Sequence, residues 1–391
     1  MWRTGAVTRG LLSAVAVSAL SAGIVPARAN APVLAGPGDQ WCAGTYDTAP
    51  HHAAKTLRFG VDPGIAGNPV PGGSVAPVSR RREDAALRGL RPRGRDLVVR
   101  LNRLFWSGGE ALLQSFRKRA AVLARQGFDV EVQVRYHPTA AQEGDIAAWT
   151  RWVRHVVDVL GADRRLVGLT ITNEVNLGIS PNTSDGSYDR ADDALIRGIE
   201  AAYDELRRHG WADRVRLGFT FAYRFDPQRD VKFWQYLAAH GGERFRSALG
   251  FVGLDDYPGT FYPPVLVPGS PTGGSPGEAL AEAAATMRRC YLPMGGVPAS
   301  VPIWVTENGY PTHGGRASEA EQRQALLDMV GAARAVGRSY GVTDYRWFNL
   351  RDNDSSGAGM FDTDGLLRDD YSHKPSYGTF RGLVRRYGTR P

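Results

Sequence analysis

The chain has 391 residues, 42% of them hydrophobic, which is enough for one large domain or two smaller ones. Its formal net charge of +8 is spread along the sequence, without a block of Lys and Arg interleaved with aromatic residues. The protein is therefore not expected to bind nucleic acid. We interpret the positive charge as a solvated basic surface in preference to a site that attracts an acidic wall polymer. Arg greatly outnumbers Lys, which is typical of a bacterial genome of high GC content.

Residues 1–29 have the pattern of a secretory signal peptide. Arg3 and Arg9 form a positive segment, Leu11–Ile24 is apolar, and Ala27-Arg28-Ala29 fits an A-x-A cleavage site. A spanning helix would need a longer apolar run and different flanks, and a second long apolar run does not follow. We therefore expect a secreted, extracellular protein without membrane contact once the signal is removed.

Two cysteines, Cys42 and Cys290, are present. In an oxidising compartment they are expected to close one disulfide, tying an N-terminal extension of residues 30–56 to a distant segment. The alternative is a pair of buried or free thiols, because sequence does not show whether their Cα atoms approach within bonding distance. CxxC motifs and Cys/His clusters typical of zinc sites are absent from the sequence.

Eight short apolar segments have the character of β-strands. They are Leu57–Asp62, Leu97–Arg103, Val130–His137, Val167–Asn173, Val215–Tyr223, Phe251–Asp256, Ile303–Thr306 and Thr343–Phe348. Amphipathic segments between them are expected to be helical, among them Arg82–Leu90, Glu110–Gln126, Glu143–Leu160, Ala191–His209 and Ser318–Tyr340. Several of these helices end at a glycine, Gly127, Gly161 or Gly210, where a left-handed C-cap is expected.

This alternation of strands and helices predicts βα units around a parallel sheet. Eight of each, without an interrupting linker, predict a single (β/α)8 TIM barrel over residues 57–391. Stretches rich in Pro, Gly and Ser follow two of the strands, at Pro63–Ser79 and Pro263–Gly277. Loops after barrel strands lie at the C-terminal face, so we expect the second stretch to form a wall of a cleft there.

Side-chain alternation indicates which residues face the barrel interior. In the third strand the polar residues Glu131, Gln133, Arg135 and His137 share one face and must point inward, because the alternate residues are apolar and pack on helices. The same rule places Arg100 of the second strand inside. A buried charge has to be paired, so Arg100 is expected to reach Glu307 or Glu131.

Two glutamates end apolar strands. Glu174 shares the parity of Thr170 and Thr172 in the fourth strand, and Glu307 shares that of Ile303 and Val305 in the seventh, which leaves Trp304 outside. Both carboxylates are therefore expected at the C-terminal rim, facing the cleft. Two carboxylates from different strands are what cleavage of a glycosidic bond requires.

Asn173-Glu174 closing a fourth strand and Glu307 closing a seventh resemble clan A of the glycoside hydrolases, the 4/7 superfamily of retaining enzymes. The resemblance extends from Leu57 to Tyr387. It implies that Glu174 is the acid/base and Glu307 the nucleophile. Asn-Glu-Val stands where the clan often has Asn-Glu-Pro, so the individual family is not resolved.

Further matches to the clan are expected to bind substrate, namely Arg100, His137, Asn173, Tyr257 and Trp347. Arg100 and Tyr257 would favour the ionised form of Glu307. Asn173 would donate to a sugar 2-hydroxyl, and Trp347 would form a stacking floor with its N–H free, with core packing as the alternative. His137 is equally consistent with a satisfied interior residue.

The expected function is thus a secreted, monomeric retaining glycosidase that acts on a poly- or oligosaccharide by double displacement, without metal or organic cofactor. A catalytically silent glycan-binding barrel and a wall-acting transglycosylase are the alternatives. Asp352–Gly357 resembles the front half of a calcium loop, but Thr363 stands where such loops use a bidentate Glu. A polar turn beside the cleft is therefore expected there.

Overall fold

The computed structural model describes residues 42, 51–64, 75–179, 181, 183–223, 226–260, 275–312, 317–359 and 361–391. The signal peptide, most of the N-terminal extension and most of both Pro/Gly/Ser-rich stretches lie outside these residues, so those expectations stay predictions. None of the helices in the described ranges is long and apolar enough to cross a membrane.

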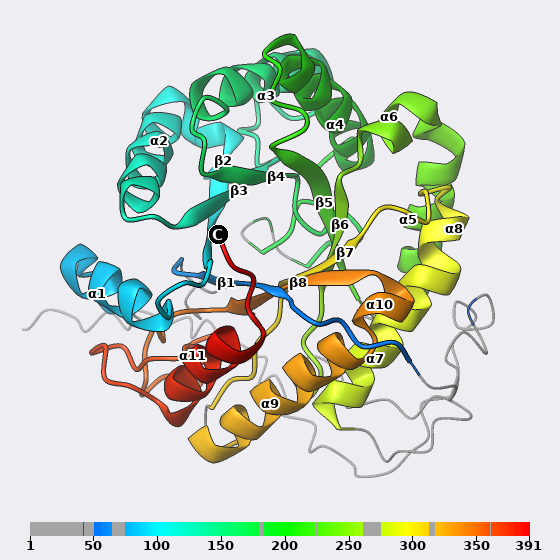
Figure 1. Cartoon of the computed structure of the whole chain (residues 1–391). Helices are drawn as coiled ribbons and strands as arrows, with labels where there is room; N and C mark the ends of the chain where they lie inside the picture. Colours follow the sequence, from blue (N-terminus) through cyan, green and yellow to red (C-terminus); the bar gives the residue numbers. More distant parts are fainter. Residues whose placement is uncertain are drawn as a thin grey trace, which may run out of the picture. The chain divides into compact units, whose positions relative to one another are not determined.

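Eight parallel strands close into a barrel in sequence order, with β1 paired to β8 (Figure 1). Their bounds are β1 Arg58–Asp62, β2 Val98–Phe105, β3 Asp129–Arg135, β4 Leu166–Ile171, β5 Arg216–Ala222, β6 Phe251–Asp255, β7 Ile303–Glu307 and β8 Val342–Phe348. The predicted single (β/α)8 TIM barrel is confirmed.

Helices surround the barrel in Figure 1. They are α1 Arg80–Leu90, α2 Gly109–Arg125, α3 Ile146–Leu160, α4 Ala191–Arg208, α5 Pro227–His240, α6 Gly242–Ala248, α7 Pro276–Thr286, α8 Leu292–Met294, α9 Glu319–Ala335, α10 Gly337–Tyr340 and α11 Pro375–Tyr387. A 3-10 turn at Trp106–Gly108 and a π-helix at Met287–Tyr291 complete the set. α3 buries one apolar face, with Trp149, Val153 and Val157, whereas α7 is buried on all sides over residues 279–286.

The predicted C-caps divide into two kinds. Gly127 (φ 83°) and Gly210 (φ 70°) are left-handed, as expected. Gly161 has φ −65° and is right-handed, so the prediction was wrong there. A Cβ on Gly161 would collide with the ring of Trp211, so this glycine serves close packing rather than a left-handed turn.

Polar side chains fill much of the barrel interior, and those of β2 and β3 face inward as alternation predicted. Arg100, Glu131 and Gln133 are fully buried or nearly so. The guanidinium of Arg100 lies 3.2 Å from Glu131 and 2.7 Å from Glu307, so it reaches both of the expected carboxylates.

Alternation failed in β7, where Trp304 faces the interior rather than the helices. Its ring stacks on Phe251 with 3.7 Å between centroids, and the guanidinium groups of Arg58 and Arg346 lie against it. Val305 instead packs in the hydrophobic core.

A register shift explains how the Glu307 carboxylate nevertheless comes to lie beside those of Glu174 and Asp255. Leu254 of β6 lies opposite Val305, whereas the next residue, Asp255, lies opposite Glu307. Thr306 is skipped in this pairing, so simple alternation does not hold at the end of β7.

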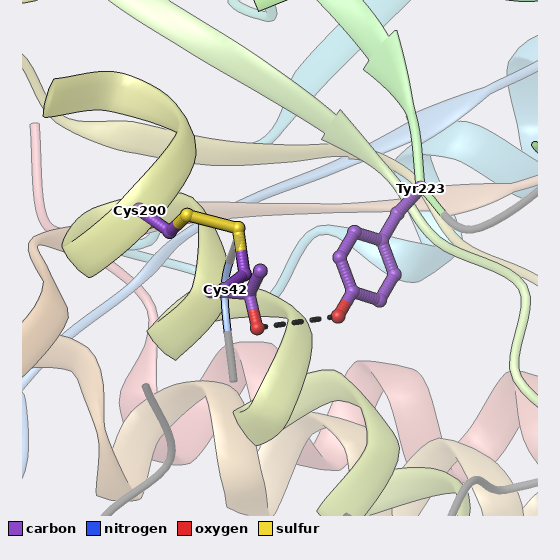
Figure 2. Close-up of a disulfide and its surroundings, with 4 residues drawn as sticks. Cys42, Tyr223 and Cys290 are labelled. Atoms are coloured by element: carbon purple, nitrogen blue, oxygen red, sulfur yellow. Dashed lines mark hydrogen bonds between the residues drawn. A yellow bond between two sulfur atoms is a disulfide. The ribbon is translucent and has the colours of Figure 1, made fainter. Parts of the chain in front are cut away.

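Cys42 and Cys290 form a disulfide, with an S–S distance of 2.04 Å and Cα atoms 5.6 Å apart. Cys290 lies in the π-helix between α7 and α8, and the side chain of Tyr223, just after β5, points toward Cys42 (Figure 2). The bridge thereby fastens a residue of the N-terminal extension to the barrel.

Candidate active site

Three carboxylates meet at the C-terminal end of the barrel. An oxygen from each of Glu174, Asp255 and Glu307 lies within 4.8 Å of the others, and all three residues are buried. We call these residues the carboxylate cluster. Retaining glycosidases have catalytic carboxyl groups about 5–5.5 Å apart and inverting ones about 6.5–9.5 Å, so the closeness of Glu174 and Glu307 favours the retaining geometry.

Glu307 ends β7 and has a hydrogen-bond donor on each carboxylate oxygen. Arg100 Nη1 donates to Oε1 at 2.7 Å, and the hydroxyl of Tyr257 donates to Oε2 at 2.8 Å. The guanidinium also provides the positive charge that a buried carboxylate needs. Both contacts favour an ionised Glu307 whose position is fixed from two sides.

Glu174 lies in a turn just beyond β4. Thr172 (φ 66°) and Glu174 (φ 46°) both have left-handed backbone conformations, which are uncommon for residues with side chains. Hydrogen bonds hold this turn: Thr172 N donates to the Val134 carbonyl at 2.8 Å, and Glu174 N to Thr220 Oγ1 at 3.1 Å. The turn, and not strand alternation, therefore brings the Glu174 carboxylate close to those of Asp255 and Glu307.

The environment of Glu174 differs from that of Glu307. Burial is the largest cause that raises the pKa of Glu174 well above its usual value, and the adjacent carboxyl groups of Asp255 and Glu307 raise it further wherever they are ionised. Its contact with Asn173 Nδ2 is long, at 3.4 Å. Glu174 is thus the member of the pair suited to carry a proton.

Asn173 is fixed by neighbours on two strands. Its Oδ1 accepts hydrogen bonds from Gln133 Nε2 at 2.5 Å and from Thr220 Oγ1 at 2.9 Å. One hydrogen of its amide nitrogen goes to the Thr183 carbonyl at 2.8 Å, and the nitrogen lies 3.4 Å from Glu174 Oε2. Because this second contact is long, the second N–H of Asn173 is able to donate to a ligand hydroxyl instead.

Asp185 was missed by the sequence analysis. Its carboxylate accepts from Arg135 Nε at 2.7 Å and from the backbone N–H of Tyr136 and Asn173, each at 2.9 Å. Burial raises the pKa of Asp185 to about 6. The residue connects the end of β3 to the Asn173-Glu174 turn and forms a buried ion pair with Arg135. Its place in a loop gave no periodic signal that would have revealed it.

Asp255 was also missed, although alternation in β6 carries the signal. Phe251 and Gly253 face the barrel interior, where they contact Trp304 and Thr306, and Asp255 is the next residue of that parity. Tyr257 was the site residue predicted in this part of the chain.

Trp347 does not match its expected role. The residue is fully buried, and its N–H donates to the Asp364 carbonyl at 3.0 Å. The expectation of a sugar-stacking floor with a free N–H was therefore wrong, and core packing was the better alternative. Arg346 contacts Glu131 inside the barrel, so alternation places Trp347 on the other face.

Phe348, one residue further, lies beside the site. Its ring is perpendicular to that of Tyr257, with 6.5 Å between centroids, and both belong to a small apolar cluster with Phe361. Phe348 therefore occupies the place at the end of β8 that sequence analysis gave to Trp347.

His137 follows β3 and is half-buried. Its Nδ1 lies 2.9 Å from Ser107 Oγ, its ring stacks on Phe105 at 4.3 Å, and Tyr188 contacts it edge-on. These contacts satisfy one ring nitrogen and fix the plane of the imidazole. A contact between His137 and substrate stays a prediction.

The Asp352–Gly357 segment does not fit calcium. Lys374 Nζ donates to Asp352 Oδ1 at 2.8 Å and to the Thr363 carbonyl at 2.9 Å. An ammonium group thus occupies the position that a cation would take between these oxygens, and the segment is a polar turn, as expected.

No protein-family model matches the sequence, and no curated protein matches it. Solved structures do resemble the fold. A family 1 β-glucosidase from Thermotoga maritima superposes with a TM-score of 0.60 at 14% identity, over 86% of this chain and 99% of that one. A GH5_18 protein from Bifidobacterium longum subsp. infantis gives 0.57 at 16%, over 86% and 80%.

A third structure, β-glucosidase 1317, has a TM-score of 0.53 at 20% identity, over 78% of this chain and 87% of that one. At identities this low, the comparisons establish the fold. The chain has the (β/α)8 barrel found in these proteins.

Proposed function

We propose that this protein is a retaining glycosidase that hydrolyses O-glycosidic bonds of a poly- or oligosaccharide by double displacement. The observation that carries the proposal is the contrast between two neighbouring carboxylates. Glu307 is held by Arg100 and Tyr257, whereas burial and neighbouring negative charge favour a proton on Glu174. A nucleophile and a proton donor require these opposite environments.

In the first step, Glu307 attacks the anomeric carbon while Glu174 gives its proton to the leaving oxygen. The negative charge of Glu307 disappears into the glycosyl ester, so a cause of the raised Glu174 pKa is removed. Glu174 then accepts a proton from water, which attacks the ester and regenerates Glu307.

Several side chains are placed to hold the sugar. The second amide hydrogen of Asn173 would bind the 2-hydroxyl, and the edge of the Tyr257–Phe348 pair would limit the space around the reacting ring. His137, fixed through Nδ1, would offer Nε2 to a further hydroxyl.

Secretion is part of the proposal. The signal-like residues 1–29 support it, and so does the Cys42–Cys290 disulfide, because disulfides persist in oxidising compartments. Action outside the cell would give access to polymeric substrates.

A panel of aryl glycosides and polysaccharides tests the activity. Two of the compared structures are β-glucosidases, so aryl β-glucosides come first. Turnover by the natural protein, with Glu307→Gln and Glu174→Gln each reducing it by several orders of magnitude, would support the proposal. Glu110→Gln, at an exposed position on α2, is the matched control and should behave as the natural protein.

The two alternatives give different results in the same experiment. A silent glycan-binding barrel would bind a glycan of the panel without releasing product. A transglycosylase would release aryl alcohol but transfer the sugar when an acceptor saccharide is added, which product analysis separates from hydrolysis.

A further inference from the structure

Asp255 is a third buried carboxylate in a site whose proposed chemistry uses two. It ends β6, lies opposite Glu307 in the strand pairing, and is 2% exposed. One of its oxygens lies within 4.8 Å of an oxygen of Glu174 and of Glu307. Neither step of double displacement assigns it a role.

The hydrogen bonds of Asp255 differ from those of Glu307. The hydroxyl of Thr306 donates to Asp255 Oδ1 at 2.6 Å. Asp255 Oδ2 is buried and receives no hydrogen bond from the described residues, because the nearby hydroxyl of Thr220 donates to Asn173 Oδ1 instead. A charged carboxylate with one bare, buried oxygen is disfavoured much more strongly than a protonated one, because burying a charge costs more than burying a neutral polar group.

Few positive charges lie near the carboxylate cluster. Within the described part of the chain, Arg100 is the one cation that forms an ion pair with a cluster member, and it is shared with Glu131 and Asp62. Arg100 from β2, Glu174 after β4, Glu307 from β7 and Tyr257 after β6 are the titratable or charged groups that face Asp255. Three negative charges in this space would repel one another with little compensation.

We propose that Asp255 is a positioning residue that holds a proton beside the two glutamates at neutral pH, so that the carboxylate cluster carries one negative charge and two protons. The inference rests on the proposed glycosidase function. Burial, together with the charge of Glu307, raises the pKa of Asp255 well above its usual value, in agreement with the geometry.

The proton count stays balanced through the reaction. In the free enzyme, Glu307 is ionised and Glu174 and Asp255 are protonated. In the glycosyl-enzyme, Glu307 is an ester, Glu174 has given its proton to the leaving oxygen, and Asp255 keeps its own. The cluster thus has one negative charge in both states, which moves from Glu307 to Glu174.

A neutral Asp255 has a consequence for Glu174. With Asp255 ionised, a second negative charge would hold the proton on Glu174 in both states and oppose its release. With Asp255 neutral, the loss of the Glu307 charge is the main change that Glu174 experiences. Asp255 therefore acts through Glu174 and need not touch the substrate.

The kinetic test is the pH profile of kcat/KM for Asp255→Asn, which imitates the protonated acid in shape and charge. We expect the basic limb to stay within about half a pH unit of the natural protein, because no charge is lost. A limb that moves down by about one unit or more would show that Asp255 had been ionised, and would overturn the proposal. Asp255→Ala should lower kcat more than it raises KM. Asp255→Asn should have a kcat close to that of the natural protein. Equal kcat values for the two variants would count against a positioning role.

An activity-free readout separates this inference from the proposed function. The infrared C=O stretch of protonated carboxyl groups is compared at pH 7 between Glu174→Gln and the double variant Glu174→Gln/Asp255→Asn. Loss of a band in the double variant supports the proton on Asp255, whether or not any glycoside is hydrolysed. Identical spectra in that region would overturn it while leaving the glycosidase proposal standing. If the double variant does not fold, the infrared spectra of the natural protein and of Asp255→Asn are compared instead. Both contain the Glu174 band, so a band lost in Asp255→Asn is assigned to Asp255.

Discussion

Two glutamates with the same side chain acquire opposite tasks from their immediate partners. Glu307 accepts hydrogen bonds from Arg100 and Tyr257, while Glu174 is buried close to two other carboxyl groups. The two environments differ in two hydrogen bonds shorter than 3 Å, which Glu307 accepts, and in the guanidinium of Arg100, which Glu307 shares with other carboxylates. Both glutamates could be identified in the sequence because each follows an apolar run, and the Glu307 contacts with Arg100 and Tyr257 are those expected from it.

The raised pKa of Glu174 sets the basic limb of activity. Its protonated form persists above the ordinary value of 4.5, so activity should be retained below the raised pKa and lost as pH rises through it. The kcat/KM profile of the natural protein checks this. In Glu174→Gln, an aryl glycoside whose leaving group needs no acid should react without that basic limb. A limb unchanged in the variant would assign it to another group.

Arg100 joins carboxylates from three strands, so its shape matters as well as its charge. In Arg100→Lys, one ammonium cannot reproduce the contacts with both Glu307 and Glu131. We expect a loss of about 3 kcal/mol in the free energy of unfolding, together with lower kcat. Urea unfolding measures the first effect, with Arg81→Lys at an exposed position of α1 as control. Equal midpoints for both variants would contradict this role.

Strand alternation located some inward-facing residues and misplaced others. It was right for β3, where Glu131 and Gln133 face the interior, because this strand keeps strict alternation along the residues concerned. It was wrong for Trp304, which was placed outside because Glu307 was expected to face inward with the parity of Ile303 and Val305. Trp304 instead packs on Phe251 between two arginines inside the barrel.

Irregularities at the ends of strands limited prediction of the site itself. The register shift between β6 and β7 and the left-handed turn at Thr172 and Glu174 decide where both glutamates point. Neither leaves a periodic pattern in the sequence. For β8, alternation from Arg346 would have selected Phe348 over Trp347, but the clan resemblance was followed instead.

Gly253 of β6 illustrates how an element supports the site. A Cβ there would collide with Thr306 Oγ1, the donor to Asp255, and would lie 3.0 Å from the Phe219 carbonyl. Gly253→Ala should therefore lower the free energy of unfolding by about 1–3 kcal/mol and reduce kcat. Gly331→Ala is the matched control, because its Cβ meets nothing within 4 Å on an exposed helix face and should add about 0.5–1 kcal/mol. Thermal unfolding of both variants checks the opposite signs.

The single disulfide acts on the whole molecule, because it closes a loop with a sequence separation of 248 residues. A crosslink of this span restricts the unfolded chain strongly, by up to about 5 kcal/mol in the chain-entropy description. We expect Cys42→Ser/Cys290→Ser to have a lower Tm than the natural protein. Addition of reductant should lower the Tm of the natural protein toward that of the variant and leave the variant unchanged. Equal Tm values without reductant would show that the bridge does not stabilise the barrel.

At the scale of the molecule, the barrel brings β2, β4, β6 and β7 to one end, where their side chains form the site. The barrel was predictable because eight βα units leave few other closures, and the compared solved structures share this fold.

Covalent labelling tests the central claim most directly. The natural protein is incubated with a set of activated 2-deoxy-2-fluoro glycosides, digested, and mapped by mass spectrometry, with Glu307→Gln in parallel. We predict one glycosyl group attached to Glu307 in the natural protein and none in the variant. A sugar that binds and reacts at another residue, or that is hydrolysed without any label on Glu307, would contradict the assignment of Glu307 as the nucleophile.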